Sequence, residues 1–200
     1  KEIQQSHPGL IVVTGRFSLW MGFIICKRYG NKIPVHAFIH GSELRKNNSW
    51  HHFLTVQSLQ SIPNIWAVSE FTRQLVEAET GRIDSRVLPN GLWLNDWSGS
   101  DVLKTSFVPK GHPAIITVGR VSKRKGQHRV VQALPTLLHS FPSIHYHMVG
   151  IADAKGPVEA LAAKLGMEHK ITFHGRIPSL QNLAGLYRSS NVFIMLSENQ

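Results

Sequence analysis

Residues 119–126 form the segment whose residue types and spacing point most clearly to chemistry. Arg120 follows an apolar run, and Lys125 with Gly126 directly precedes a segment of helical periodicity. Cationic side chains attract phosphate groups, and so does the amino end of a helix, which carries a partial positive charge. The segment therefore predicts a phosphate or diphosphate site, with a solvated basic turn as the alternative interpretation.

Histidine supplies the second candidate group. His40 stands at the end of an apolar run, where it can donate a hydrogen bond to a substrate and titrate near neutrality. The alternative is a structural histidine. His51 with His52, and His145 with His147, form two further pairs, but no HExxH, CxxC or carboxylate completes either set. We therefore predict no metal site.

Other reaction chemistries find little support in the sequence. It contains no GxSxG nucleophile motif, no GK(S/T) or GxGxxG phosphate loop, and no DxD triplet to hold a metal-bound nucleotide sugar. Cys26 is the only cysteine and stands in an apolar helical segment, so we expect an unreactive thiol and no internal disulfide.

The elements that must position these groups are short apolar runs. Most of them are continuously apolar, which is typical of strands covered on both faces in a parallel sheet. Ligands bind beyond the carboxyl ends of such strands, so the residues directly after each run are the candidates for a site. The predicted strands are residues 10–14, 35–39, 65–68, 86–88, 114–118, 144–149, 171–174 and 192–196.

Helical patterns fill the segments between these runs. Residues 127–141 and 157–165 each place apolar side chains on one helical face, and Pro157 is typical of a first helical position. Ser69 and Ser179 are the predicted N-caps of two more helices. The side chains expected to face inward from these two helices are Phe71, Leu75, Val76, Leu183, Leu186 and Tyr187. The alternation predicts an α/β fold.

The regular alternation breaks at residues 96–112. This stretch is rich in Gly, Ser, Pro and Asp and shows no apolar period. We predict that it is an interdomain linker between a first domain at residues 1–95 and a second domain at residues 113–200.

Composition limits the class of protein and its partners. The 200 residues include 22 Lys and Arg against 12 Asp and Glu, a net charge of +10, and 42% hydrophobic residues. This is a globular composition without an apolar run long enough for a membrane-spanning helix. The positive charge favours phosphorylated ligands, acidic lipid or nucleic acid. The basic residues are scattered and form no known nucleic-acid motif, so no nucleic-acid partner is predicted.

A series of motifs, in this order, resembles the GT-B-fold glycosyltransferases of the retaining family 4, the glycosyl transferases group 1. The element GR-x4-KG at residues 119–126 is the most specific of them. The matching pieces are VHAFIHGSE (35–43), IWAVSEFTRQL (65–75), VLPNGLWL (87–94), IITVGRVSKRKGQHRVVQALP (115–135), IHYHMVG (144–150), ITFHGRI (171–177) and LYRSSNVFIMLSE (186–198).

This resemblance implies a fold of two Rossmann-like domains whose parallel sheets face each other across a cleft. It implies transfer of a hexose from a nucleoside diphosphate sugar, UDP or GDP, to an acceptor hydroxyl with retention and without a metal. By the same resemblance, Arg120 and Lys125 hold the donor diphosphate and His40 approaches the transferred sugar, which makes these three the predicted catalytic residues. The backbone around Ile177 is expected to meet the nucleobase, and Ser197 to lie near the nucleotide. Gly119, Gly150 and Arg176 complete the predicted donor-binding set.

The resemblance also has gaps. A glycine-rich loop near the start of the first domain and the E-x7-E element are not found, and Glu198 has no partner that would identify it as either glutamate of that element. We therefore expect both domains to be incomplete here, and the chain alone to lack activity. The expected setting is cytoplasmic, peripheral at the inner face of an anionic membrane, with a glycan or lipid-linked acceptor in polysaccharide or glycolipid synthesis. The alternatives are a non-catalytic basic module that binds anions or nucleic acid, and a GT-B sugar-nucleotide epimerase.

Overall fold

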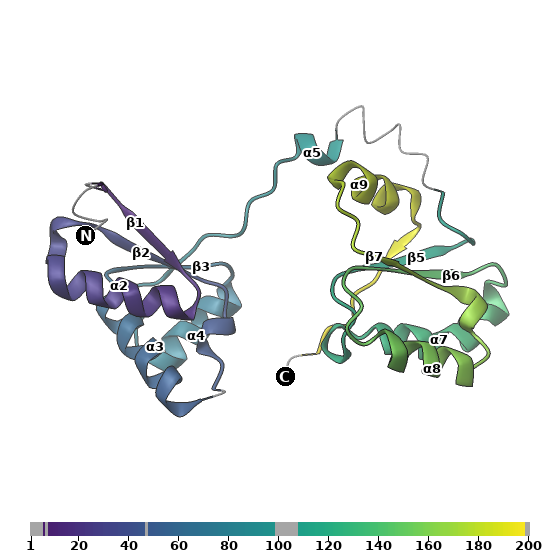
Figure 1. Cartoon of the computed structure of the whole chain (residues 1–200), viewed down its shortest axis with the longest axis horizontal. Helices are drawn as coiled ribbons and strands as arrows, with labels where there is room; N and C mark the ends of the chain where they lie inside the picture. Colours follow the sequence, from purple (N-terminus) through teal and green to yellow (C-terminus); the bar gives the residue numbers. More distant parts are fainter. Residues whose placement is uncertain (1–5, 7, 47, 99–107, 199–200) are drawn as a thin grey trace. The chain divides into compact units, whose positions relative to one another are not determined.

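The computed structural model describes residue 6 and residues 8–46, 48–98 and 108–198. The chain divides into two compact units, Lys1–Leu92 and Trp93–Gln200, which we name unit 1 and unit 2 (Figure 1). The predicted α/β class is confirmed, because each unit has a parallel sheet with helical connections. Much of the predicted linker at 96–112 falls on residues 99–107, which lie outside the described residues, so its bounds stay a prediction.

Unit 1 has a four-stranded parallel sheet in the order β1-β2-β3-β4. Its strands are β1 (Ile11–Thr14), β2 (Val35–Ile39), β3 (Asn64–Ala67) and β4 (Arg86–Val87). Its helices are α2 (Arg16–Tyr29), α3 (Ser49–Ser61) and α4 (Glu70–Thr80), with the short turns η1 (Gly30–Lys32) and η2 (Ser42–Leu44). Each strand lies beside its predecessor, so successive right-handed crossovers carry the three helices to one face of the sheet (Figure 1).

The burial of β2 shows the consequence of this one-sided arrangement. Val35, Ala37 and Ile39 point toward the helices and are buried, whereas His36 and Phe38 point the other way and are half-buried. Among the described residues, the prediction of strands covered on both faces is therefore wrong for unit 1. Apolar residue types alone do not distinguish a strand with helices on one face of its sheet from a strand with helices on both faces.

Unit 2 also has a four-stranded parallel sheet, in the order β7-β6-β5-β8. Its strands are β5 (Ala114–Val118), β6 (His145–Val149), β7 (Ile171–Gly175) and β8 (Val192–Phe193). Its helices are α5 (Asn95–Ser98), α7 (Gln127–Ser140), α8 (Lys155–Lys164) and α9 (Leu180–Ser189), with the short turns η3 (Lys123–Lys125) and η4 (Glu168–Lys170).

The strand order of unit 2 explains why its central strands have helices on both faces of the sheet. The chain runs outward from β5 to β6 and β7 and then returns to the far side of β5 as β8. The outward crossovers place α7 and α8 on one face, and the return places α9 on the other (Figure 1). All five residues of β6 are consequently buried, as are Ala114, Ile115, Ile116 and Thr117 of β5. For these strands the prediction of cover on both faces is confirmed.

The predicted helix starts at two serines are confirmed. The Ser69 side chain accepts a hydrogen bond from the Thr72 N–H of α4 at 3.2 Å. The Ser179 side chain accepts one from the Asn182 N–H of α9, also at 3.2 Å. Each serine satisfies a backbone donor that has no partner within its helix, which fixes where the helix begins.

Three predicted details differ from the structure. Phe71 is 66% exposed rather than inward-facing, because the buried stripe of α4 runs through Thr72, Val76 and Thr80. Helix α8 begins before Pro157, which lies in its first turn, where the missing N–H costs no helical hydrogen bond. The last strand ends at Phe193 instead of extending through 192–196.

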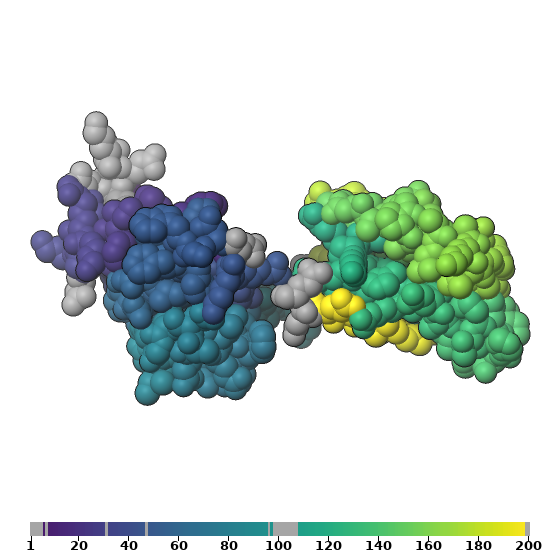
Figure 2. Space-filling view, turned by 90° about the horizontal axis from the view of Figure 1, so that it is seen from below, coloured from purple at the N-terminus to yellow at the C-terminus, as the bar shows by residue number. Residues whose placement is uncertain are grey.

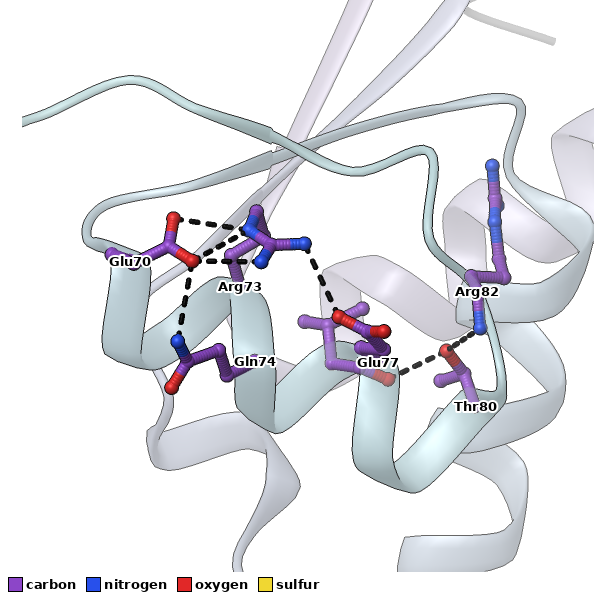
Figure 3. Close-up of polar contacts among 7 residues, drawn as sticks. Glu70, Arg73, Gln74, Glu77, Thr80 and Arg82 are labelled. Carbon is purple, nitrogen blue, oxygen red and sulfur yellow. Dashed lines mark hydrogen bonds and ion pairs between the residues drawn. The ribbon is translucent and has the colours of Figure 1, made fainter.

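The outward face of α4 carries a group of charged side chains (Figure 3). Arg73 lies between Glu70, at 2.7 Å, and Glu77, at 3.2 Å, and its guanidinium lowers the pKa of the Glu70 carboxyl through their hydrogen bonds and charge attraction. Exposed pairs of this kind stabilise a helix only slightly. No helix in the described part of the chain is both long and apolar enough to cross a bilayer.

Candidate functional site

The loop after β5, residues 119–126, lies where the strand order of unit 2 changes direction. β5 has β6 on one side and β8 on the other, and the chain visits β8 last. In open parallel sheets, ligands bind outside the carboxyl ends of the strands at such a switch point. The loop includes η3 and leads directly into α7, so its cationic residues stand beside the amino end of a helix of 14 residues.

The loops after β5, β6 and β8 touch one another through their backbones. Gly126 has φ +74°, and a Cβ atom there would lie 2.2 Å from the Leu196 carbonyl oxygen. Gly150 has φ +135°, and a Cβ atom there would lie 2.3 Å from the Gly119 carbonyl oxygen. Glycine is therefore needed at both positions, for its conformation and for the close approach. The predicted residues Gly119 and Gly150 are in this way brought together.

The segment after β8 also lies against the loop after β5. The Glu198 N–H donates to the Arg124 carbonyl oxygen at 2.8 Å, and the Glu198 carboxylate contacts the Arg129 guanidinium of α7. Figure 2 shows the last described residues of the chain, in yellow, at the surface of unit 2 beside green residues of the same unit. Three loops that are far apart in sequence thus form one continuous surface.

Arg120 and Lys125 extend from this loop to different partners. The Arg120 Nη1 atom lies 2.7 Å from Asp153 Oδ2 in the loop after β6, and the Arg120 side chain is 63% exposed. The Lys125 ammonium lies 3.7 Å from the Met195 sulfur in the segment after β8. One cation is therefore directed toward each of the two strands that flank β5, and their joint action on one diphosphate stays a prediction.

The other predicted residues of unit 2 follow β7 and β8: Arg176 and Ile177 come directly after Gly175, and Ser197 lies four residues after Phe193. Arg176 and Ser197 are exposed, and Ile177 is half-buried. The Ile177 side chain packs against a small cluster that includes Val149 and Leu186. The side chain of Ile177 is thus used for packing, which leaves its backbone as the part that could meet a ligand.

His40 lies in unit 1, at the carboxyl end of β2, and its side chain is exposed. Its backbone N–H donates to Glu43 Oε2 at 3.2 Å. Glu43 is only 3% exposed, and its carbonyl oxygen accepts two hydrogen bonds from the Arg16 guanidinium, at 2.9 and 3.1 Å. The turn that presents His40 is therefore held by a buried carboxylate.

Three residues that contact the predicted set had no role assigned from the sequence: Glu43, Asp153 and Gln127. Glu43 and Asp153 follow predicted strands closely and so were among the candidate positions. Gln127 gives no such signal, because a polar residue at the start of a helix is common. Its burial, with 1% exposure, is decided by the loop that folds over it.

Histidines of β6 and β7 form a separate cluster. His147 Nε2 lies 2.9 Å from the Lys110 carbonyl oxygen and His147 Nδ1 lies 2.9 Å from His174 Nε2, while His145 Nε2 lies 2.8 Å from Thr172 Oγ1. Burial lowers the pKa of all three histidines, that of His145 to about 4. Their nitrogens bond to one another and to oxygens, and the described residues contain no group of three or more His, Cys, Asp or Glu placed to hold a metal ion.

Comparison with protein families gives one match. The family model described as glycosyl transferases group 1 matches residues 102–199. The matched residues therefore include the loop that follows β5, the strands β6, β7 and β8, and the segment that follows β8. No significant match to a curated protein sequence is found.

Solved structures resemble both units. The Anabaena protein HepE in complex with UDP is 20% identical with a TM-score of 0.80, and the match covers 99% of this chain and 56% of that one. A glycosyltransferase from Rickettsia africae is 22% identical with a TM-score of 0.69, covering 98% and 53%. The lipopolysaccharide outer core galactosyltransferase WaaB is 17% identical with a TM-score of 0.66, covering 98% and 52%.

These likenesses concern the fold. The α/β arrangement with two parallel four-stranded sheets matches that of GT-B glycosyltransferases, as the motif order predicts. The chain spans about half the length of the structures it matches.

Proposed function

We propose that this chain is part of a group 1 glycosyltransferase of family 4, and that unit 2 binds a nucleoside diphosphate sugar. The single observation that carries the proposal is the cationic loop at the switch point, which opens into the amino end of α7. Such a site suits a diphosphate, because it joins cationic side chains to a helix dipole. The family model match over the same residues supports the reading.

In the proposed reaction, the bond between the anomeric carbon and the β-phosphate oxygen breaks, and the acceptor oxygen bonds to that carbon with retention. The departing diphosphate keeps the electron pair of the broken bond and so gains negative charge, and the acceptor proton passes to a diphosphate oxygen or to water. Arg120 and Lys125 stabilise this charge in place of a metal ion. His40 contacts the transferred hexose from unit 1. Ile177, through its backbone, and Ser197, with Gly119, Gly150 and Arg176, border the nucleotide.

The decisive test is removal of the Lys125 charge in the intact enzyme. We expect Lys125→Ala to lower donor turnover by about 10²–10³-fold, because one contact to a charge that develops in the transition state is worth about 2–4 kcal/mol. The measurement is kcat with a nucleoside diphosphate sugar and acceptor. The matched control is Lys164→Ala, which removes the same charge from an exposed position at the end of α8.

Normal transfer by Lys125→Ala would overturn the diphosphate assignment. Release of a free nucleoside diphosphate and a rearranged sugar without any acceptor would favour an epimerase instead. Strong binding of DNA or RNA, with an affinity that falls steeply with salt, would favour a basic binding module.

UDP is the first donor nucleotide to test. HepE has been crystallised with UDP-glucose, and the pneumococcal O-GlcNAc transferase GtfA with UDP and GlcNAc. Both resemble this chain in fold, with TM-scores of 0.76 and 0.68. Calorimetric titration of UDP, GDP and ADP, with and without EDTA, separates the base preference from any metal requirement. We propose a polysaccharide or glycolipid acceptor.

We also propose that the protein is cytoplasmic and that unit 1 contacts an anionic membrane. The α2–α3 face consists of the exposed side chains Phe17, Met21 and Ile24 of α2 and Trp50 and Phe53 of α3. The two helices pack together, since the Trp20 indole N–H donates to Thr55 Oγ1 at 3.2 Å. Lys27 and Arg28 stand in the last turn of α2. Aromatic and apolar side chains beside cations suit the interface of an acidic bilayer.

A further inference from the structure

The loop that carries Arg120 and Lys125 is held from inside the unit by a buried side chain. Gln127 is the first residue of α7 and is only 1% exposed. Its Nε2 atom donates to the Arg120 carbonyl oxygen at 3.1 Å, and its Oε1 atom accepts from the Ser122 N–H at 3.3 Å. The side-chain amide of Gln127 thus bonds to both neighbours of Val121, through its nitrogen to Arg120 and through its oxygen to Ser122.

Other backbone groups of this stretch bond to the loop after β6 or within the loop itself. The Val121 N–H donates to the Ile151 carbonyl oxygen at 2.8 Å, and the Ala154 N–H donates to the Val121 carbonyl oxygen at 3.1 Å. The Lys125 N–H donates to the Ser122 carbonyl oxygen at 3.0 Å. Gln127 therefore supplies the bonds to residues 120 and 122, while the loop after β6 holds residue 121.

The anchoring of Gln127 makes it a rigid support. Helix α7 buries Val130, Val131 and Leu134 in the core of unit 2, so its first turn cannot shift without disturbing that core. Arg120, by contrast, has a long and exposed side chain that would lose conformational freedom on binding a ligand. If the backbone of Arg120 is already fixed in the free protein, less conformational entropy is lost when the ligand binds.

From this geometry we infer that Gln127 is a positioning residue for the anion site, because it sets the backbone from which Arg120 reaches a diphosphate. The inference rests on the proposed function for the identity of the ligand. It assigns Gln127 no contact with the ligand itself.

The test compares two variants of the intact protein that lose packing or hydrogen bonds in the same helix. Gln127→Met keeps the side-chain volume and removes both hydrogen bonds. Val131→Ala, at a fully buried position of α7, weakens the core without touching the loop. We expect Gln127→Met to weaken binding of UDP and of inorganic pyrophosphate by about 10-fold each, because a loop that is no longer held in the free protein must be ordered when the ligand binds. Val131→Ala should leave both affinities within about 2-fold of those of the parent, although its melting temperature should fall at least as far as that of Gln127→Met.

A second readout does not depend on any ligand. Amide hydrogen exchange at residues 120–125 should accelerate in Gln127→Met and stay unchanged in Val131→Ala. If the parent binds neither UDP nor pyrophosphate, the proposed function fails, and the exchange experiment still decides whether Gln127 holds the loop. The inference is overturned if Gln127→Met exchanges and binds like the parent, or if Val131→Ala loses affinity in proportion to its stability.

Discussion

Arg120 illustrates how one residue combines a fixed backbone with an exposed functional group. Its carbonyl oxygen accepts from buried Gln127, whereas its guanidinium pairs with Asp153 at the surface. The side chains of this pair are 63% and 46% exposed, so the pair contributes little to stability. The same carboxylate would nevertheless compete with a phosphate for the guanidinium, because both are oxygen anions.

We expect Asp153→Asn to tighten UDP binding about 2–5-fold, the range that an exposed ion pair of below about 1 kcal/mol allows. The gain should shrink at high salt, because exposed charges are screened. Calorimetric titration at low and high salt measures both effects. The control is Glu168→Gln, which removes an exposed carboxylate elsewhere in unit 2. Weaker binding by Asp153→Asn would mean that the carboxylate orients Arg120 rather than competing for it.

At the scale of elements, β6 and β7 are joined by the histidine cluster. The Lys110 carbonyl oxygen can only accept, so His147 Nε2 donates to it. Burial lowers the pKa of His147 and so favours its neutral form, in which Nδ1 accepts from His174. Lys110 and Lys170 lie near His145 and disfavour its protonation further.

The pKa of each cluster histidine is lower in the folded unit than its ordinary value, so the unfolded chain takes up protons first as the pH falls. Unit 2 should therefore be most stable above about pH 6.5 and lose stability toward pH 4. The pKa of His145 is about 4 in the folded unit. Protonation of this residue in the unfolded chain should therefore lower the free energy of unfolding at pH 5 by about 2 kcal/mol relative to neutral pH. Denaturant unfolding of the parent and of His145→Gln at pH 7.5 and pH 5 measures the difference.

The variant His145→Gln should show a shallower fall in the free energy of unfolding, since glutamine does not titrate. His139→Gln, at an exposed position of α7, serves as the control and should follow the parent. Identical pH dependence in all three proteins would remove the histidine cluster as the source of acid sensitivity.

At the scale of the molecule, the charge of +10 and the apolar side chains of the α2–α3 face lead to one expectation. The protein should float with vesicles that contain anionic phosphatidylglycerol and stay behind with purely zwitterionic vesicles. Replacing Trp50 and Phe53 together by serine should reduce the bound fraction several-fold, because both side chains are more than half exposed and would be buried in the interface.

The control for flotation is Ile83→Ser, which removes one apolar side chain that is 77% exposed outside the α2–α3 face. It should bind anionic vesicles like the parent. If the serine double variant also binds like the parent, charge alone drives the attraction and the α2–α3 face has no role.

Much of this fold was open to prediction because its signals are local. Apolar runs predicted each strand to within a few residues, and Ser69 and Ser179 marked helix starts because a capping hydroxyl acts on the next turn. Phe71 was placed wrongly because a shift of one residue along a helix turns a side chain by about 100°. Whether helices cover one face of a sheet or both depends on the order of its strands, and hydrophobic periodicity does not encode that order.

The sequence alone determined the chemistry at hand: the cations at 120 and 125, the glycines beside them, and the helix that follows. Only the tertiary structure decided their surroundings. It put β8 next to β5, seated Gly126 against Leu196, gave Arg120 the carboxylate of Asp153 and enclosed Gln127 beneath the loop. These contacts join residues far apart in the chain or close a loop on itself, and packing rather than local preference brings such groups together.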